Sequence, residues 1–211
     1  MFHFEKKKLR AGFTHILGCD EVGRGSLAGS VVATAVLIDT QAIDLLKGLT
    51  WITEITDSKK LTPANRERLS QELIGNGIIH ATGFVSPAQV DKLNIHNASL
   101  LAMHKAVQEI LKISGCGVDK VLVCVDGRFV IPKLHVAQEA VVDGDNLVFS
   151  VSTASIVAKV YRDELMMKLD KKFPGYDFGK HKGYGTQLHI KAMGKQGLSS
   201  IHRKSFCKKY V

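Results

Sequence analysis

The pattern of apolar and polar positions predicts strands near the start of the chain. Residues 14–22 and 29–38 are rich in β-branched side chains and alternate as half-buried strands do. The segment between them, GRGSLAG, has the glycines that a tight connection needs, so we expect the two strands to form a hairpin. A third strand is expected at residues 77–85.

Helices interrupt the strands farther along the chain. Thr62 before Pro63 predicts the start of a helix over residues 63–74, because threonine caps a helix and proline fits its first position. Apolar residues at helical spacing predict a second helix over 97–113, followed by the apolar strand VDKVLVCVDG. The remaining elements predicted are a strand near 136–142, a long helix over about 152–170 with Ser152 as its cap, a loop over 173–187, and helices at 187–195 and near 199–208.

The order of these elements predicts an α/β fold. Strands in succession, followed by strands that alternate with helices, favour a mixed β-sheet flanked by helices. A chain of 211 residues that is 45% hydrophobic is long enough for one substantial core. We therefore expect a single domain over residues 1–211, with the core over about 1–170 and a basic helical C-terminal extension over about 171–211.

Charge is distributed unevenly along the chain. The net charge is +9, and residues 171–211 hold ten lysines or arginines and one acid, which leaves nineteen basic and nineteen acidic residues before them. Together with His181, His189, His202 and two aromatic residues, such a segment is suited to binding a polyanion. When basic side chains neutralise phosphates, the counterions condensed on them are released, which favours binding. A tail that only increases solubility is an equal alternative.

The first residues, MFHFEKKKLR, lack the apolar run of a secretory signal, and no stretch approaches the ~18–20 apolar residues that span a bilayer. A cytoplasmic protein without membrane association is therefore expected. Cys19, Cys116, Cys124 and Cys207 are dispersed and form no C-x-x-C pair, so we interpret them as reduced, buried thiols.

Acidic residues end two of the apolar strands. Asp20 and Glu21 follow ILGC, and Asp126 follows VLVCV. Burial of two adjacent ionised acids is costly unless a positive partner binds them, and a metal ion is the simplest partner. Taken singly, an aspartate before a glycine at a strand end, such as Asp126, is more often a turn residue.

Neighbouring strands would bring Asp20, Glu21 and Asp126 together, and Asp143 and Asp145, which follow the next predicted strand, offer a fourth carboxylate. Mg²⁺ and Mn²⁺ prefer oxygen ligands, and two such ions about 3.5–4 Å apart promote phosphodiester hydrolysis. A glycoside hydrolase fits less well, because aromatic residues make up only 7% of the chain. The glycines of GRGSLAG do not match G-x-G-x-x-G, which argues against a dinucleotide-binding loop.

Six segments resemble, in order and spacing, the motif set of bacterial ribonuclease HII, the type 2 ribonuclease H. They are GCDEVGRGSLAGSVVATAV (18–36), DSKKLT (57–62), CVDGR (124–128), DGDN (143–146), STASIVAKVYRD (152–163) and HKGYGT (181–186). The resemblance runs from about Ile16 to Phe206 and implies an RNase H-like fold. It also implies an endonuclease that hydrolyses the RNA strand of RNA/DNA hybrids and nicks 5′ of ribonucleotides embedded in duplex DNA.

The resemblance implies divalent Mg²⁺ or Mn²⁺ as the cofactor and two-metal catalysis, which leaves 3′-hydroxyl and 5′-phosphate ends. The catalytic metal ligands would be Asp20, Glu21, Asp126 and Asp145. Asp143 stands where the family usually has lysine, so it is open which of Asp143 and Asp145 is the fourth ligand. The arginine in GRG, where ribonuclease HIII has lysine, favours type HII.

The resemblance also implies a set of substrate contacts. Gly23, Arg24 and Gly25 would read the ribose, because only a ribonucleotide offers a 2′-hydroxyl. Tyr184 would pack against the sugar at the RNA-to-DNA junction. Lys59 and Lys60 would touch phosphates, and Lys159 and Asp163 have the spacing of an ion pair on one helix. A monomer is expected. A non-catalytic nucleic-acid-binding module, or another RNase H-like nuclease, remains the alternative.

Overall fold

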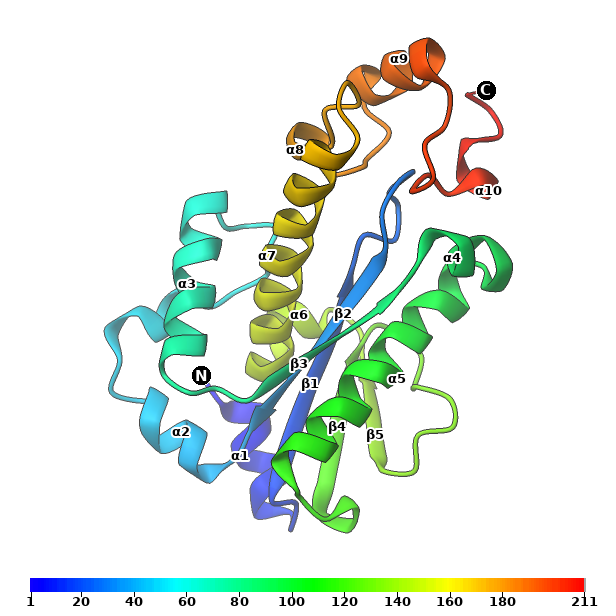
Figure 1. Ribbon diagram of the computed structural model, residues 1–211. Helices are drawn as coiled ribbons and strands as arrows, with labels where there is room; N and C mark the ends of the chain where they lie inside the picture. The colour runs from blue at the N-terminus through cyan, green and yellow to red at the C-terminus, as the bar shows by residue number, and fades with distance from the viewer. Residues whose placement is uncertain (211) are drawn as a thin grey trace.

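One mixed sheet forms the centre of the molecule, as a computed structural model that describes residues 1–210 shows (Figure 1). Its strands are β1 (His15–Val22), β2 (Val31–Ile38), β3 (His80–Val85), β4 (Val121–Asp126) and β5 (Ala137–Val141). The strand order is β3-β2-β1-β4-β5. β2 pairs antiparallel with β1 and β3, whereas β4 pairs parallel with β1 and β5. The hairpin and the mixed sheet predicted from the sequence are confirmed.

The helices are α1 (His3–Arg10), α2 (Thr40–Leu46), α3 (Pro63–Gly75), α4 (Pro87–Leu93), α5 (Ile95–Ser114), α6 (Gly144–Leu147), α7 (Phe149–Lys172), α8 (Phe178–His181), α9 (Gln187–Gln196) and α10 (Lys204–Cys207). Short 3-10 helices cover Thr50–Glu54 and Val118–Lys120. The sequence pattern did not predict α1, α2, α4 or α6, and α8 lies inside the segment expected to be a loop. No helix in residues 1–210 is long and apolar enough to cross a membrane.

The two long helices cover opposite faces of the sheet. Leu17 and Cys19 of β1 pack in one apolar cluster with Met103 of α5, whereas Ile16 packs in another with Val151 of α7. Figure 1 shows both helices running along the sheet. α7 approaches β1 so closely that a Cβ at Gly18 would lie 2.1 Å from the carbonyl carbon of Ser150. Only glycine therefore allows this contact, which brings the α7 motif residues next to the end of β1.

The start of α7 differs from the prediction. The helix begins at Phe149, so Ser152 is not its cap, and the Ser152 hydroxyl instead donates to the carbonyl oxygen of Asp145 at 2.7 Å. The buried carboxylate of Glu5 accepts a hydrogen bond from the Ser150 amide at 2.8 Å. Because a side chain from α1 satisfies an amide of the first turn, α7 begins without a local capping residue.

The C-terminal extension packs onto the β1–β2 connection, residues 23–30. The amide of Leu27 donates to the carbonyl of Gly183 at 2.8 Å, and the amide of Gly29 donates to that of Ile201 at 2.9 Å. Phe178 packs in one small apolar cluster with Ala28 of the connection, and Met193 packs in another with Leu27. The four cysteines are free, and all except Cys116 are buried.

Candidate active site

Asp20 and Asp126 lie at the same end of two adjacent parallel strands. The register pairs Cys19 of β1 with Val125 of β4, so the aspartates that follow are neighbours. Asp20 is 6% exposed, and its Oδ1 accepts the amide of Glu21 at 2.7 Å. The parallel pairing thus brings together carboxylates that are more than one hundred residues apart in the sequence.

These acids repel one another in a partly desolvated setting. Burial raises the pKa of Asp20 well above its usual value, and the charges of Glu21 and Asp126 raise it further, against hydrogen bonds that include one from Ser155. Burial, followed by the charge of Asp145, raises the pKa of Asp126. Buried oxygen ligands that repel one another suit a hard divalent cation, whose charge would relieve the repulsion.

Asp145, and not Asp143, lies with these acids. Asp145 is 4% exposed on α6, whereas Asp143 is exposed at the N-terminal end of that helix. The amide of Gly144 donates to Asp126 Oδ1 at 2.9 Å, which ties α6 to the end of β4. The geometry therefore favours Asp145 as the fourth member of the site.

Basic side chains already contact two of the acids. Arg24 Nη1 lies 2.8 Å from Glu21 Oε1, and Lys59 Nζ lies 3.0 Å from Asp145 Oδ2. Within residues 1–210, no group of three or more histidine, cysteine, aspartate or glutamate side chains is arranged to hold a metal ion. The chemistry of the donors fits a divalent cation, and a cation would compete with Arg24 and Lys59 for Glu21 and Asp145.

Two buried arginines hold the glycine loop beside the acids. Arg203 donates to the carbonyl oxygens of Gly29 at 2.8 Å and Arg24 at 2.9 Å. Arg162 donates to the Ser26 hydroxyl at 2.9 Å. Gly23 has φ +89°, and a Cβ there would lie 2.2 Å from Arg162 Nε. A side chain at position 23 would therefore displace the arginine that supports the loop.

Comparison with known proteins decides the family of this chain. The family model described as ribonuclease HII matches residues 17–209. The ribonuclease HII of Caldicellulosiruptor bescii is 43% identical over 98% of this chain and 93% of its own length. That of Dehalococcoides mccartyi is 44% identical, over 96% and 90%. The chain belongs to the ribonuclease HII family. It is thus an endoribonuclease, a hydrolase that acts on the RNA strand of RNA/DNA hybrids.

Solved structures show the same fold. The PCNA–RNase HII complex of Archaeoglobus fulgidus contains a chain with a TM-score of 0.69 and 25% identity, over 92% of this chain and 94% of that one. Bst-RNase HIII in complex with Mn²⁺ gives a TM-score of 0.72 at 16% identity, over 96% and 71%. The RNase H-like fold predicted from the ribonuclease HII motifs is confirmed.

The DSKKLT segment of this ribonuclease HII chain is held in place by hydrogen bonds to α7 and α3. The Ser58 hydroxyl lies 2.9 Å from that of Ser155, and Arg66 Nε donates to the Ser58 carbonyl at 2.9 Å. The predicted ion pair on α7 is confirmed, with Lys159 Nζ 2.6 Å from Asp163 Oδ1. Lys60 bonds to the side chain of Asn146, so both lysines expected at phosphates contact groups of α6.

Tyr184 lies beside the glycine loop and packs against Arg162. Its side chain is 36% exposed, and the guanidinium carbon of Arg162 lies 5.6 Å from the ring centroid. The hydrogen bond between the Leu27 amide and the Gly183 carbonyl places Tyr184 next to the loop. Tyr184 and residues 23–25 therefore share the buried support of Arg162.

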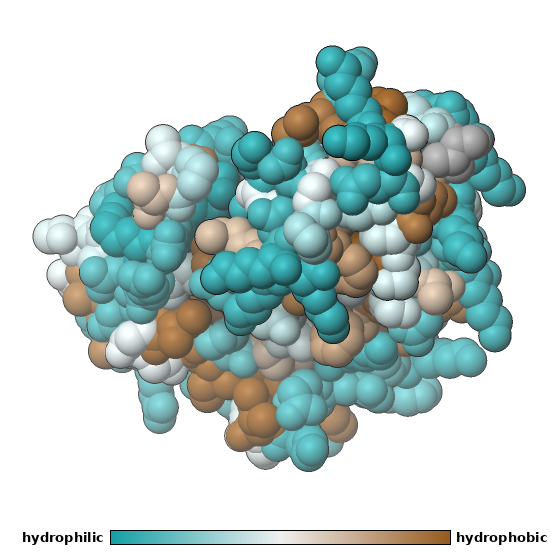
Figure 2. All heavy atoms as spheres, turned by 45° about the horizontal axis from the view of Figure 1, so that its top comes forward, coloured by the Kyte–Doolittle hydropathy of each residue, from teal (hydrophilic) through white to brown (hydrophobic). Residues whose placement is uncertain are grey.

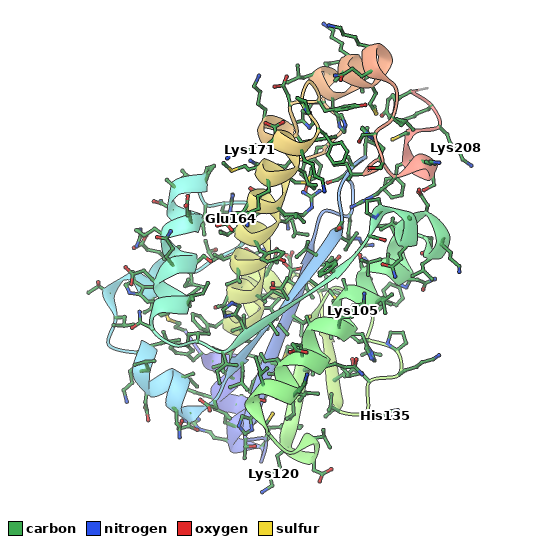
Figure 3. All side chains as sticks on the ribbon, viewed as in Figure 1. Lys105, Lys120, His135, Glu164, Lys171 and Lys208 are labelled. Atoms are coloured by element: carbon green, nitrogen blue, oxygen red, sulfur yellow. The ribbon has the colours of Figure 1, made fainter. Side chains whose placement is uncertain are left out.

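The structure corrects part of the prediction for the basic extension. Arg203, His181, His189 and His202 were counted with the groups that face a polyanion, but all four are buried. Most of the lysines remain exposed, and Lys171 and Lys208 lie at the same end of the molecule in Figure 3. Figure 2, turned to bring this end forward, shows a largely hydrophilic face. The exposed positive charge thus comes from lysines, whereas the arginine and histidines support the loops beneath.

The buried arginines were missed as functional residues. The only signal for Arg162 was its place in the STASIVAKVYRD motif, and Arg203 carried none, because a basic residue in a basic segment is expected to be solvated.

Proposed function

We propose that the enzyme also nicks duplex DNA on the 5′ side of embedded ribonucleotides, leaving 3′-hydroxyl and 5′-phosphate ends by two-metal catalysis. The observation that carries this proposal is the position of the Asp20 carboxylate cluster directly beside the Gly23–Gly25 loop. Cutting and ribose recognition would then occupy one continuous stretch of chain at the end of β1.

Asp20, Glu21, Asp126 and Asp145 would hold two Mg²⁺ or Mn²⁺ ions. When bound, such ions favour the ionised form of the attacking water and neutralise charge on the leaving oxygen. The neutral hydroxyls of Ser155 and Ser58 support Asp20 without adding charge. The Gly144 amide holds the Asp126 carboxylate against the start of α6.

The Gly23–Gly25 loop supplies substrate choice in this proposal. Gly25 has nothing within 4 Å of its missing Cβ, so a sugar can approach the backbone there. Because a ribose 2′-hydroxyl both donates and accepts, backbone amides and carbonyls in a fixed loop can distinguish it from deoxyribose. Tyr184 would pack against the sugar on the DNA side of the junction.

Lys59 and Lys60 would move from Asp145 and Asn146 to phosphates when substrate binds. Both side chains are exposed, and a lysine contacts a phosphate as a flexible point charge. The exposed lysines of the C-terminal extension would add attraction that depends on salt and not on sequence. A cytoplasmic location and a monomeric state remain parts of the proposal, as expected from the sequence.

The test compares three duplexes of equal length: all DNA, DNA with one ribonucleotide, and an RNA/DNA hybrid. Purified protein is incubated with each duplex in Mg²⁺, in Mn²⁺ and in EDTA, and the product ends are mapped. We expect a metal-dependent nick 5′ of the single ribonucleotide and no cut in the all-DNA duplex. Cutting of the hybrid alone would reject the proposal for embedded ribonucleotides.

Asp126→Asn is the control for the acid site, because asparagine keeps an oxygen for the Gly144 amide but removes the charge. We expect cutting to be lost while duplex binding, measured by fluorescence anisotropy, survives. Salt-sensitive binding with no cutting by the wild-type protein would instead favour a non-catalytic nucleic-acid-binding module.

A further inference from the structure

Three buried histidines, the first residue of HKGYGT among them, lie together next to Tyr184. The rings of His181 and His189 stack with centroids 4.3 Å apart, and the Nε2 atoms of His189 and His202 are 3.0 Å apart. All three side chains are less than 10% exposed. The cluster joins α8, α9 and the segment before α10, and none of its members belongs to the acid site.

The contacts of His189 determine where each proton lies. Its Nδ1 is 2.9 Å from the carbonyl oxygen of Tyr184, which can only accept, so Nδ1 carries a hydrogen. Burial lowers the pKa of His189 to about 4, so the ring is neutral at pH 7 and Nε2 accepts. The hydrogen between the two Nε2 atoms therefore belongs to His202.

The rest of the network agrees with this assignment. If His202 Nε2 donates, its Nδ1 must accept, and the Ser199 amide donates to it at 2.9 Å. His181 Nε2 faces the Tyr176 carbonyl at 2.8 Å, and its Nδ1 accepts the Gly183 amide at 3.2 Å. Three neutral rings thus satisfy every ring nitrogen, with donors and acceptors in one consistent order.

We infer that His189 is a positioning residue for recognition of the RNA-to-DNA junction: through Nδ1 it fixes the backbone of Tyr184, and Ser199 and His202 fix His189. This inference rests on the role proposed for Tyr184. The Tyr184 amide also donates to the carbonyl of His181 at 3.0 Å, so the cluster holds the residue on both sides of its Cα.

The direction of the Tyr184 ring follows from this anchoring. The adjacent carbonyl of Gly183 accepts from Leu27 at 2.8 Å, which ties the same turn to the glycine loop. With its backbone held between these contacts, Tyr184 keeps its ring over Arg162 and partly exposed to substrate. Without the His189 contact, the carbonyl of Tyr184 would lose the hydrogen bond from Nδ1, and the backbone here would keep its contacts with the glycine loop and His181.

A pair of amide substitutions separates positioning from packing. In His189→Asn the side-chain amide nitrogen takes the place of Nδ1, so the bond to Tyr184 is kept. In His189→Gln the side-chain amide reaches the place of Nε2, where its oxygen accepts from His202, so the bond to Tyr184 is lost. The measurement is kcat and KM for a duplex with one RNA-to-DNA junction and for a continuous hybrid.

We expect His189→Gln to raise KM for the junction substrate about five- to tenfold, the effect of one lost neutral hydrogen bond, with kcat retained. His189→Asn should stay within about twofold of wild type. In a Tyr184→Ala background, His189→Gln should add no further loss, because both changes remove the same contact. Equal junction preference in both variants, or losses that only follow their melting temperatures, would overturn the inference.

Imidazole ¹⁵N NMR gives a readout that does not depend on cutting. At pH 7 it should show hydrogen on Nδ1 of His189 and on Nε2 of His202, and the opposite tautomer of His189 would overturn the inference. Failure of the proposed function would look different: the wild-type protein would show no junction preference, while these tautomers would be unchanged.

Discussion

The Lys59 ammonium group lies 3.0 Å from Asp145 Oδ2, within the acid cluster. Burial lowers the pKa of Lys59, but the hydrogen bond to Asp145 and the charges of Asp145, Asp57 and Asp20 outweigh it and raise the pKa overall. Because the Lys59 side chain is 78% exposed, it can leave the site at little cost. Lys59 thus supplies positive charge that a metal ion would replace.

Lys59→Met should therefore tighten metal binding in the absence of nucleic acid. Removal of a nearby positive charge lowers the repulsion that an incoming cation meets, and we expect the Kd for Mn²⁺ to fall about two- to fivefold. Isothermal titration calorimetry measures this change. The matched control is Lys60→Met, whose side chain bonds to the neutral Asn146, and equal effects of the two substitutions would contradict the prediction.

Asp20→Asn should stabilise the metal-free protein while it abolishes cutting. The substitution removes one of several buried charges of the same sign, and relief of about 1 kcal/mol raises Tm by ~2–4 °C for a chain of this size. Thermal unfolding in EDTA tests the stability, and nicking in Mg²⁺ tests the chemistry. Asp143→Asn, at an exposed position, should leave both unchanged. A lower Tm for Asp20→Asn would show that the lost hydrogen bonds outweigh the repulsion.

Arg203→Met should loosen the glycine loop and destabilise the fold by about 3 kcal/mol. The change leaves the carbonyls of Gly29 and Arg24 without a buried donor, and unsatisfied buried groups cost about 1–3 kcal/mol each. Urea unfolding measures the loss, and the rate ratio for ribonucleotide and all-DNA duplexes measures discrimination. Lys204→Met, next to it and exposed, should change stability by no more than about 0.5 kcal/mol. Unchanged discrimination in a folded Arg203→Met protein would contradict a role in holding the loop.

The free energy of unfolding should fall as the pH is lowered from about 6.5 to 4. Burial holds the pKa of His189 at about 4, below the 6.5 of an unfolded chain, so in this range the unfolded state binds the proton more tightly. The loss should reach about 3 kcal/mol at pH 4. At each pH, the difference in free energy of unfolding between wild type and His189→Asn isolates this contribution, because the other titratable groups are common to both proteins. Parallel curves for the two proteins would contradict it.

Local sequence patterns were sufficient to predict most helices and strands and to locate the acids at the ends of strands. Proline and threonine at the start of α3, and alternation in β1 and β2, are signals that neighbouring residues carry. α7 shows where this fails, because its first turn is satisfied by Glu5, which lies 145 residues away. The motif resemblance supplied the candidate set, including Asp145, which spacing alone did not distinguish from Asp143.

The sequence by itself determined that carboxylates lie at the ends of apolar strands, next to a glycine loop. Hydrophobic alternation and the backbone freedom of glycine are local properties. Only the tertiary structure decided which charged side chains are exposed to substrate and which are paired or buried. It paired Lys59 with Asp145 and buried Arg162, Arg203 and the three histidines as supports, since burial and hydrogen-bond partners depend on segments far apart in the chain. The physical reason is that a side chain's charge and proton are set by its neighbours in space, and these neighbours come from segments that only the folded chain brings together.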